Sequence, residues 1–345
     1  MPWDEGLVNS LVYDRPDPKD GRVLSYAQAI NEALTIALES DQGVFVLGQG
    51  VDDPTAMFGT TRGLQKQFGV DRVFDTPLSE EAMMGVSAGA AMNGMRPVFM
   101  HNRPDFVLLA FNQLVTHAAK FHFMDNGQTN VPMVVWAAIG RGWGSGAQHS
   151  QAIHGMLLGV PGLKIVMPST PYDAKGLLIS SILDNNPVCV FEHRWLMKKD
   201  GVVPDGFYRV PIGKGIYRRR GNDVTIVGAS HAIELGFQAA NQLAGEGIES
   251  DVIDLRTIKP LDEHIVLESL HKTGRIVVVD TAWMKGGVCA EIGCLAAEKG
   301  FADLRAPVVR IGLPDVPTPA GYTLEQFYYP DTTRIANAVR QLVRS

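Results

Sequence analysis

The sequence lacks the features that mark several classes of protein. Its 345 residues contain no apolar run that approaches membrane-spanning length, and residues 1–5 show no basic region followed by an apolar stretch. We therefore expect neither a membrane span nor a signal peptide. The longest basic run is residues 218–220, and the formal net charge is −6. This charge pattern gives no indication of nucleic-acid binding.

Cysteine is also scarce. The three cysteines, Cys189, Cys289 and Cys294, are odd in number and do not have the spacing of a metal site. We interpret them as buried thiols of a cytoplasmic protein, where disulfides are rare. Hydrophobic residues make up 46% of the chain and charged residues 20%, a composition that supports well-packed cores. The length allows two domains.

The first half of the chain alternates short apolar runs with segments of helical periodicity. Ser25 is a good N-cap for a helix over residues 26–40. The predicted strands are 44–48, 96–100, 131–139, 164–167 and 188–192, and further helices are predicted over 105–121 and 171–183. Such alternation indicates parallel βαβ units. Residues 1–24 are polar and contain prolines, and we interpret them as an N-terminal arm.

A second alternating block follows a change in composition. Residues 194–221 are rich in Lys, Arg, Gly and Pro, and we interpret them as a linker with one or two β segments. The strands then predicted are 224–228, 249–254, 275–280 and 308–311, with helices over 232–245, 261–272 and 287–299. The predicted fold class is α/β with two open, mostly parallel sheets and flanking helices. The domains are 25–193 and 222–345.

One stretch stands out in the first block, residues 74–81 and the small-residue helix after it. Ser79 is a suitable N-cap, and Glu80 and Glu81 would then lie in the first helical turn, near the positive end of the helix dipole. The following residues, up to position 94, carry almost no charge, which predicts a buried helix at an interface. A carboxylate at the mouth of such a helix is a capping acid or a catalytic one, and capping acids are the commoner kind.

The amino-acid sequence of this stretch resembles that of a known family. Residues 75–80 (D-T-P-L-S-E), 89–91 (G-A-A) and 94–97 (G-M-R-P) resemble the β subunits of thiamine-diphosphate-dependent 2-oxo acid dehydrogenases. These E1 components, of the pyruvate, branched-chain and acetoin type, belong to the transketolase-like superfamily. The resemblance implies a pyrimidine-binding domain in 25–193 and a transketolase C-terminal-like domain in 222–345.

The same resemblance implies which residues meet the cofactor. Glu80 would bond the N1′ nitrogen of the aminopyrimidine ring, so that the ring can take the weakly acidic C2 proton of thiamine. Leu78 would also contact the cofactor, and Phe106 would pack against the pyrimidine. From the sequence pattern alone, an aromatic residue in an apolar helix is more often part of the core.

A second candidate catalytic residue follows a glycine-rich loop. The loop at 140–146 would by itself indicate a flexible turn. However, residues 147–151 read A-Q-H-S-Q, a string that E1 β subunits share. The resemblance implies that His149 lies at the active-site funnel, where it orients substrate and moves protons, work suited to a group that titrates near neutrality.

The resemblance also extends to a possible metal site. Residues 161–168, 173–178 and 184–188 match the family, in which this region holds a potassium ion largely through backbone carbonyls. By position the ligands would involve Met133, Ser181, Asp184 and Asn186, and oxygen donors suit such a hard cation. An Asn-Pro turn before a strand explains residues 184–188 equally well.

Two strings depart from the family near the expected substrate end. Residues 100–106 read M-H-N-R-P-D-F where the family has a string such as F-M-T-F-N-F, and residues 137–143 replace its R-G-P-N-G. The usual substrate assignments therefore do not transfer directly. We predict that His101, Arg103 and Arg141 belong to the substrate end, where either arginine could bind an anionic group.

One absence points to a partner. Thiamine enzymes grip the diphosphate through Mg²⁺ held by a G-D-G motif with an Asn some residues on, and the sequence contains no such motif. We therefore expect an α-type subunit to hold the diphosphate and Mg²⁺, in an α2β2 assembly.

The resulting prediction is the β subunit of a two-component enzyme that decarboxylates a 2-oxo acid and passes the acyl unit to the lipoyl group of an acyltransferase. One alternative is the C-terminal half of a split transketolase-like enzyme that moves a two-carbon ketol unit between sugars. Another is a non-catalytic scaffold subunit, which predicts that replacing Glu80 has no effect on activity.

Overall fold

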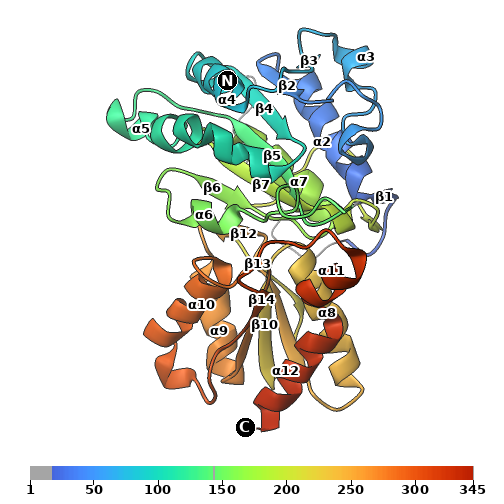
Figure 1. Ribbon diagram of the computed structural model, residues 1–345, viewed down its shortest axis with the longest axis vertical. Helices are drawn as coiled ribbons and strands as arrows, with labels where there is room; N and C mark the ends of the chain where they lie inside the picture. The colour runs from blue at the N-terminus through green and yellow to red at the C-terminus, as the bar shows by residue number, and fades with distance from the viewer. Residues whose placement is uncertain (1–17, 143, 345) are drawn as a thin grey trace. The chain divides into compact units, whose positions relative to one another are not determined.

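The structure is a computed structural model that describes residues 18–142 and 144–344. Its contacts divide these residues into two compact units. Unit 1 comprises residues 18–139 and 160–212, and unit 2 comprises 213–344 together with the segment 140–159 (Figure 1). Most of the predicted N-terminal arm lies outside the described residues. No helix in the described ranges has the length and apolarity to cross a bilayer.

Unit 1 is built on a parallel sheet. Its strands are β2 (Val44–Gly48), β3 (Val73–Phe74), β4 (Arg96–His101), β5 (Val134–Ile139), β6 (Lys164–Val166) and β7 (Val188–His193). They lie in the order β6-β7-β5-β4-β2-β3, and each neighbouring pair is parallel. A short ribbon of β1 (Val23–Ser25) and β8 (Asp200–Val202) is antiparallel. Because the strands are parallel, their carboxyl ends meet at one edge, where α/β proteins bind ligands.

Two helices, α2 (Tyr26–Ser40) and α7 (Pro171–Leu183), cover one face of this sheet. The Ser25 side chain accepts from the Gln28 backbone and the Gln28 side chain accepts from the Ser25 N–H, so the predicted N-cap of α2 is confirmed as a capping box. The core between them includes Leu34, Trp136 and Leu178. This rigid layer fixes the strands whose carboxyl ends carry the candidate site.

Helix α4 (Glu80–Met92) packs against β4 and two irregular helical turns. The turns, Pro104–Ala110 and Asn112–Ala118, have 3-10 and π geometry, and the four-residue helix α5 (Phe121–Met124) follows. The predicted single helix over 105–121 is therefore wrong in detail. Helix α3 (Leu64–Phe68) is also short. Within the predicted linker, residues up to 212 belong to unit 1, and Tyr208 is buried there in a stack with Tyr172.

Unit 2 contains the second sheet. Its strands are β9 (Ile216–Arg219), β10 (Val224–Gly228), β11 (Ser250–Asp254), β13 (Ile276–Trp283) and β14 (Val309–Leu313). The short strand β12 (Thr257–Lys259), which follows β11 in the chain, is not part of this sheet. The order is β14-β13-β10-β11-β9, with only β9 antiparallel to its neighbour. The predicted class of two open, mostly parallel sheets is confirmed.

The helices of unit 2 are α6 (His154–Leu158), α8 (His231–Ala244), α9 (Glu263–Thr273), α10 (Val288–Glu298), α11 (Tyr322–Tyr328) and α12 (Thr332–Arg344). Four of them flank the second sheet. Helices α8 and α12 lie on one face and α9 and α10 on the other (Figure 1). The apolar core of unit 2 lies between β10, β13 and the pair α8 and α12.

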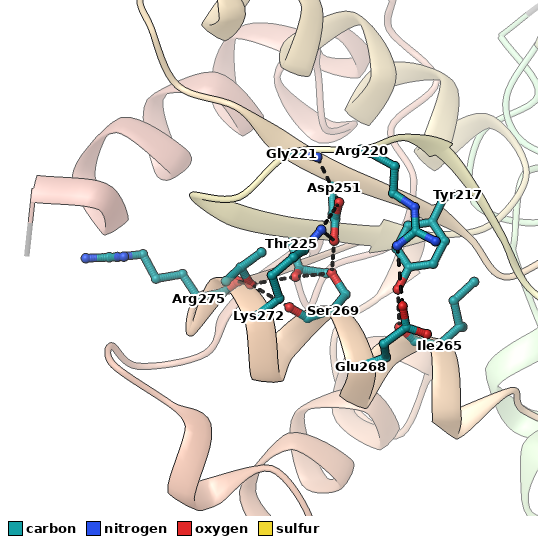
Figure 2. A network of polar contacts seen from close by, with 11 residues as sticks. Tyr217, Arg220, Gly221, Thr225, Asp251, Ile265, Glu268, Ser269, Lys272 and Arg275 are labelled. Carbon is teal, nitrogen blue, oxygen red and sulfur yellow. Dashed lines mark hydrogen bonds and ion pairs between the residues drawn. The ribbon is translucent and has the colours of Figure 1, made fainter.

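A buried polar network ties α9 to the sheet of unit 2 (Figure 2). The Asp251 carboxylate on β11 is fully buried and accepts from Gly221 N at 2.8 Å, Ser269 Oγ at 2.6 Å and Lys272 Nζ at 2.7 Å. Thr225 Oγ1 on β10 lies 2.6 Å from Ser269 Oγ. Because each oxygen of Asp251 has partners, the network stabilises unit 2 and presents no free site.

We expect Asp251→Ala to lower the free energy of unfolding by about 1–3 kcal/mol, since it leaves the Gly221 N–H and the Ser269 hydroxyl without their buried acceptor. Urea titration followed by circular dichroism measures the loss. Glu249→Ala is the matched control, because the Glu249–Arg219 pair lies nearby but is half exposed. It should cost less than about 1 kcal/mol. Equal losses in the two variants would contradict the structural role given to Asp251.

Candidate active site

The carboxyl edge of the unit 1 sheet gathers several polar side chains. Gln49 follows β2, Glu80 opens α4, and His101 ends β4 with Asn102 next in the chain. Strands β2 and β4 are paired neighbours, so their carboxyl ends lie side by side. This is the edge at which the α/β architecture predicts a ligand.

Glu80 is the central acid of this edge. Its residue is only 8% exposed although it is the first residue of a helix. Gln49 Nε2 donates to Glu80 Oε1 at 3.2 Å, and Asn102 Nδ2 donates to the Gln49 carbonyl at 3.0 Å. A carboxylate at this position is favoured by the helix dipole. The predicted cap differs, because Ser79 holds the N-cap position without a side-chain hydrogen bond.

A hollow of about 570 Å³ lies beside Glu80. Its lining residues are Leu78, Ser79, Glu80, Glu81, Ala82 and Leu109. Leu78 is 78% exposed and Leu109 is 59% exposed in this chain. The hollow therefore combines one buried carboxylate with apolar walls that face outward, a combination that suits a flat, nitrogen-bearing ring.

Three further predicted residues lie in the same unit. His101 is buried, and its burial lowers the pKa of the imidazole to about 3, so the ring is neutral. Its ring centroid lies 4.2 Å from that of Phe99. Burial also lowers the pKa of Arg103, whose Nη1 donates to the Asn102 carbonyl at 3.3 Å. Phe106 is partly buried in the turn Pro104–Ala110.

The other two candidates, His149 and Arg141, lie in unit 2. Both belong to the segment 140–159, which follows β5 in the chain but packs with residues of the C-terminal half. The His149 N–H donates to the Gly146 carbonyl at 3.5 Å, and Arg141 Nη1 donates to Glu325 Oε2 at 2.6 Å. The structure thus places Glu80, Leu78, His101, Arg103 and Phe106 in unit 1, and His149 and Arg141 in unit 2.

The predicted potassium ligands lie at the opposite, amino-terminal edge of the unit 1 sheet. Asp184 Oδ2 accepts from Lys164 Nζ, and Asp184 Oδ1 accepts from the side chain and backbone of Asn186. The Asp184 carbonyl accepts from Arg96 Nη1 at 3.1 Å, and the Met133 carbonyl accepts from the Val188 N–H at 2.9 Å. Lys164 and Arg96 thus already pair with Asp184, whereas the Met133 carbonyl accepts only from a backbone N–H.

The fourth predicted ligand is engaged as well. Ser181 Oγ donates to the Leu177 carbonyl at 2.7 Å. In the part of the chain that the structure describes, no group of three or more His, Cys, Asp or Glu side chains could hold a metal ion. The Ser181 hydroxyl keeps its lone pairs when it donates, and the Met133 carbonyl has one lone pair beyond its bond to Val188, so the potassium site stays a prediction.

Sequence reasoning missed Gln49, Asn102 and Glu192. A Gln after a strand carries no distinctive signal, and its contact with Glu80 depends on the pairing of distant strands. Glu192, fully buried on β7, accepts from Trp136 Nε1 at 2.8 Å, and burial raises the pKa of its carboxyl to about 8. The apolar run around Glu192 predicts a strand but not a partner for the acid.

Comparison with known protein families matches both halves of the chain. Residues 22–199 match the transketolase pyrimidine binding domain, and residues 213–335 match the transketolase C-terminal domain.

Two relatives are similar over most of their length. The chain is 39% identical to the acetoin:2,6-dichlorophenolindophenol oxidoreductase subunit beta of Bacillus subtilis, and 40% identical to the 2-oxoisovalerate dehydrogenase subunit beta of the same organism. Each alignment covers 93% of this chain and 98% of the relative.

A solved structure supports the fold. The structure described as a split gene transketolase, an inactive beta4 tetramer, superposes with a TM-score of 0.73 at 22% identity, covering 94% of this chain and 99% of that one. Together, the domain matches and the long alignments show that the chain belongs to the family of transketolase-like E1 β subunits, as the motif at residues 75–80 predicted.

Proposed function

We propose that this chain is the β subunit of a two-component thiamine-diphosphate enzyme of the 2-oxo acid dehydrogenase type, with Glu80 as the acid that activates the cofactor. The observation that carries the proposal is the placement of Glu80. Its carboxylate is buried at the start of α4, held by Gln49, and lines an apolar-walled hollow. A capping acid of ordinary kind would need neither the side-chain donor nor the hollow.

Thiamine diphosphate, when bound, supplies a C2 atom that attacks a carbonyl group after losing its proton. The contribution of this chain to the loss of the C2 proton is the carboxylate of Glu80, held in a fixed position. Glu80 would place its carboxylate against the ring nitrogen N1′ of the bound cofactor, and Gln49 Nε2, which donates to Glu80 Oε1, holds that oxygen in position. Leu78 lines the same hollow, and Phe106 is the aromatic residue that we assign to pack the pyrimidine.

The substrate-side residues are assigned by their chemistry. We place His149 as the group that orients substrate and moves protons, and Arg103 as the cation for an anionic substrate group. We keep His101 at the substrate end as a neutral polar group, because its burial lowers the pKa of the imidazole to about 3. Arg141 is a weaker candidate for anion binding because Glu325 already neutralises its charge.

An α-type partner completes the site in this proposal. The motif that holds Mg²⁺ and the diphosphate is missing from the sequence, so the partner supplies it. Exposed apolar side chains on unit 1 support such a surface: Leu109 lines the hollow and is 59% exposed, and Val86 and Phe123 are 56% and 89% exposed. We propose an α2β2 complex that passes its acyl group to a lipoyl-bearing acyltransferase. Cys189 and Cys289 are buried free thiols as predicted, whereas Cys294 is exposed, so the prediction of three buried thiols is wrong for Cys294. We propose a cytoplasmic location, where disulfides are rare.

Potassium binding remains a prediction. Met133, Ser181, Asp184 and Asn186 offer oxygen donors, and of these Asp184 is already engaged by Lys164 and Arg96. A potassium titration that raises the melting temperature of the assembled complex above the value found with sodium would support the site.

The experiment that tests the function is a substrate screen on the complex with its α partner. We expect CO₂ release from a 2-oxo acid together with reduction of an artificial electron acceptor, and the panel should include pyruvate, branched-chain 2-oxo acids and acetoin. Turnover of acetoin alone would keep the family and change the substrate class. Ketol transfer between sugar phosphates, with no turnover of any of these, would replace the proposal by the split transketolase alternative, whose phosphosugars Arg103 would also suit.

A further inference from the structure

The segment that carries His149 belongs to unit 2 although it follows a strand of unit 1. Residues 140–142 and 144–153, which we name the His149 loop, run from the end of β5 to the start of α6. Their contacts cluster with the C-terminal half of the chain. Few loops of this length keep one conformation without side-chain contacts that hold them, which we call anchors. The contacts at the two ends of this loop therefore decide how well its conformation is fixed.

The first anchor is an ion pair at the start of the loop. Arg141 Nη1 lies 2.6 Å from Glu325 Oε2, with side-chain exposures of 20% and 4%. The guanidinium carbon also lies 5.7 Å from the ring centre of Tyr329. Glu325 comes from α11, so the anchor joins the loop to the C-terminal half. A charge-assisted hydrogen bond to a buried carboxylate is among the stronger polar contacts.

The second anchor lies where the loop ends. His154, the first residue of α6, is fully buried, and its Nε2 lies 3.1 Å from both oxygens of Asp280. Asp280 is on β13, a strand inside the sheet of unit 2. The contact therefore ties the end of the loop to the most rigid layer of this unit.

Between the anchors the backbone of the loop lies directly against unit 2. Gly144 and Gly146 have φ angles of +66° and +63°, and a Cβ added to Gly146 would lie 3.2 Å from the Cβ of Ala320. Just after the loop, a Cβ on Gly155 would lie 3.0 Å from the Cα of Gly287. Glycine is needed at these positions for its conformation and its small size.

We propose that Glu325 and Asp280 are positioning residues that, through Arg141 and His154, hold both ends of the His149 loop on unit 2 and so fix the place of His149. The inference rests on the proposed role of His149. It gives the C-terminal domain a part in catalysis that needs no contact between that domain's own acids and the substrate.

The test uses Glu325→Gln and Asp280→Asn in the complete complex, since each change keeps the size and removes the charge. Hydrogen–deuterium exchange with mass spectrometry measures how well the backbone amides of residues 144–153 are protected, and it needs no substrate. We expect faster exchange in these peptides, with peptides of β10 (Val224–Gly228) unchanged as the internal reference. We also expect kcat to fall on the order of 10²-fold with KM little changed, because a small displacement of a catalytic group has about this effect.

Two controls separate positioning from general stability. Glu246→Gln removes an Arg–Glu pair of the same 2.6 Å length, with Arg340, elsewhere on unit 2. It should leave loop exchange and kcat unchanged. Arg141→Lys keeps the charge, and it should restore much of the loop protection that Arg141→Gln loses.

The outcomes distinguish this proposal from the function on which it rests. Unchanged loop exchange in both acid variants overturns the anchors, whatever the activity. Faster exchange with normal kcat overturns the positioning role, and His149→Ala then decides the wider question. If His149→Ala is also fully active, the assigned role of His149 fails; if it is inactive, only the positioning fails.

Discussion

Glu80→Gln is expected to lower the turnover of the assembled complex by about 10²–10⁴-fold, the range typical for loss of one acid–base group. The amide keeps the size of the side chain and can still bond the N1′ nitrogen. However, it cannot hold the negative charge that lets the pyrimidine accept the C2 proton. The fold and most of the cofactor affinity should therefore remain. Steady-state kinetics gives kcat, and calorimetry gives the Kd for thiamine diphosphate.

Glu81→Gln is the matched control for this change. Glu81 is the next residue on α4 and points about 100° away around the helix axis. It is exposed, and Asn112 Nδ2 donates to its Oε1 at 3.3 Å. It should keep nearly normal turnover. If Glu81→Gln were the crippled variant, the register of the motif assignment would be wrong by one residue. If neither change mattered, the scaffold alternative would gain.

The second large effect concerns the partner. We expect this chain alone to turn over no substrate and to bind thiamine diphosphate weakly, with activity appearing only when the α-type subunit is added. The physical reason is that the chain offers Glu80 and the pyrimidine hollow but no motif for Mg²⁺ and the diphosphate. Loss of the diphosphate contacts removes most of the charge-based affinity.

Calorimetry on the purified chain, with and without Mg²⁺, measures this directly. The control is the same titration on the chain mixed with its partner, where binding should become tight and Mg²⁺-dependent. Tight, Mg²⁺-dependent binding by the chain alone would contradict the split site. Val86, Leu109 and Phe123 are exposed apolar residues. Backbone amides near them should exchange hydrogen more slowly when the partner binds, because the partner covers this surface.

Much of the fold was predictable because its signals are local. The Ser25 cap, the helical period after it and the apolar strand 44–48 each depend on a few neighbouring residues, and all three are confirmed. Helix α12 was missed, although Ile335, Val339 and Leu342 recur on one face. The predicted helix at 105–121 failed because its turns change hydrogen-bond pattern, which residue spacing does not encode.

The residues of the candidate site also divide into those that local sequence motifs predict and those that only the tertiary structure reveals. Glu80 and His149 were found through long motif strings, whereas Gln49 reaches Glu80 only because β2 and β4 are adjacent in the sheet. Chain order predicts that the His149 loop stays with the domain whose strand precedes it. It packs with unit 2, where Glu325 and Asp280, more than a hundred residues away in the sequence, are the hydrogen-bond partners of Arg141 and His154. The boundaries predicted for the domains remain predictions.

Hydrogen–deuterium exchange at C2 of thiamine diphosphate, followed by NMR after a rapid quench, tests the central claim most directly because it needs no substrate. The account predicts fast exchange in the complex with the wild-type chain and with Glu81→Gln. It predicts exchange close to that of the free cofactor in the complex with Glu80→Gln. Exchange that is equally fast with Glu80→Gln and with the wild type would contradict the claim that Glu80 of this chain activates the cofactor.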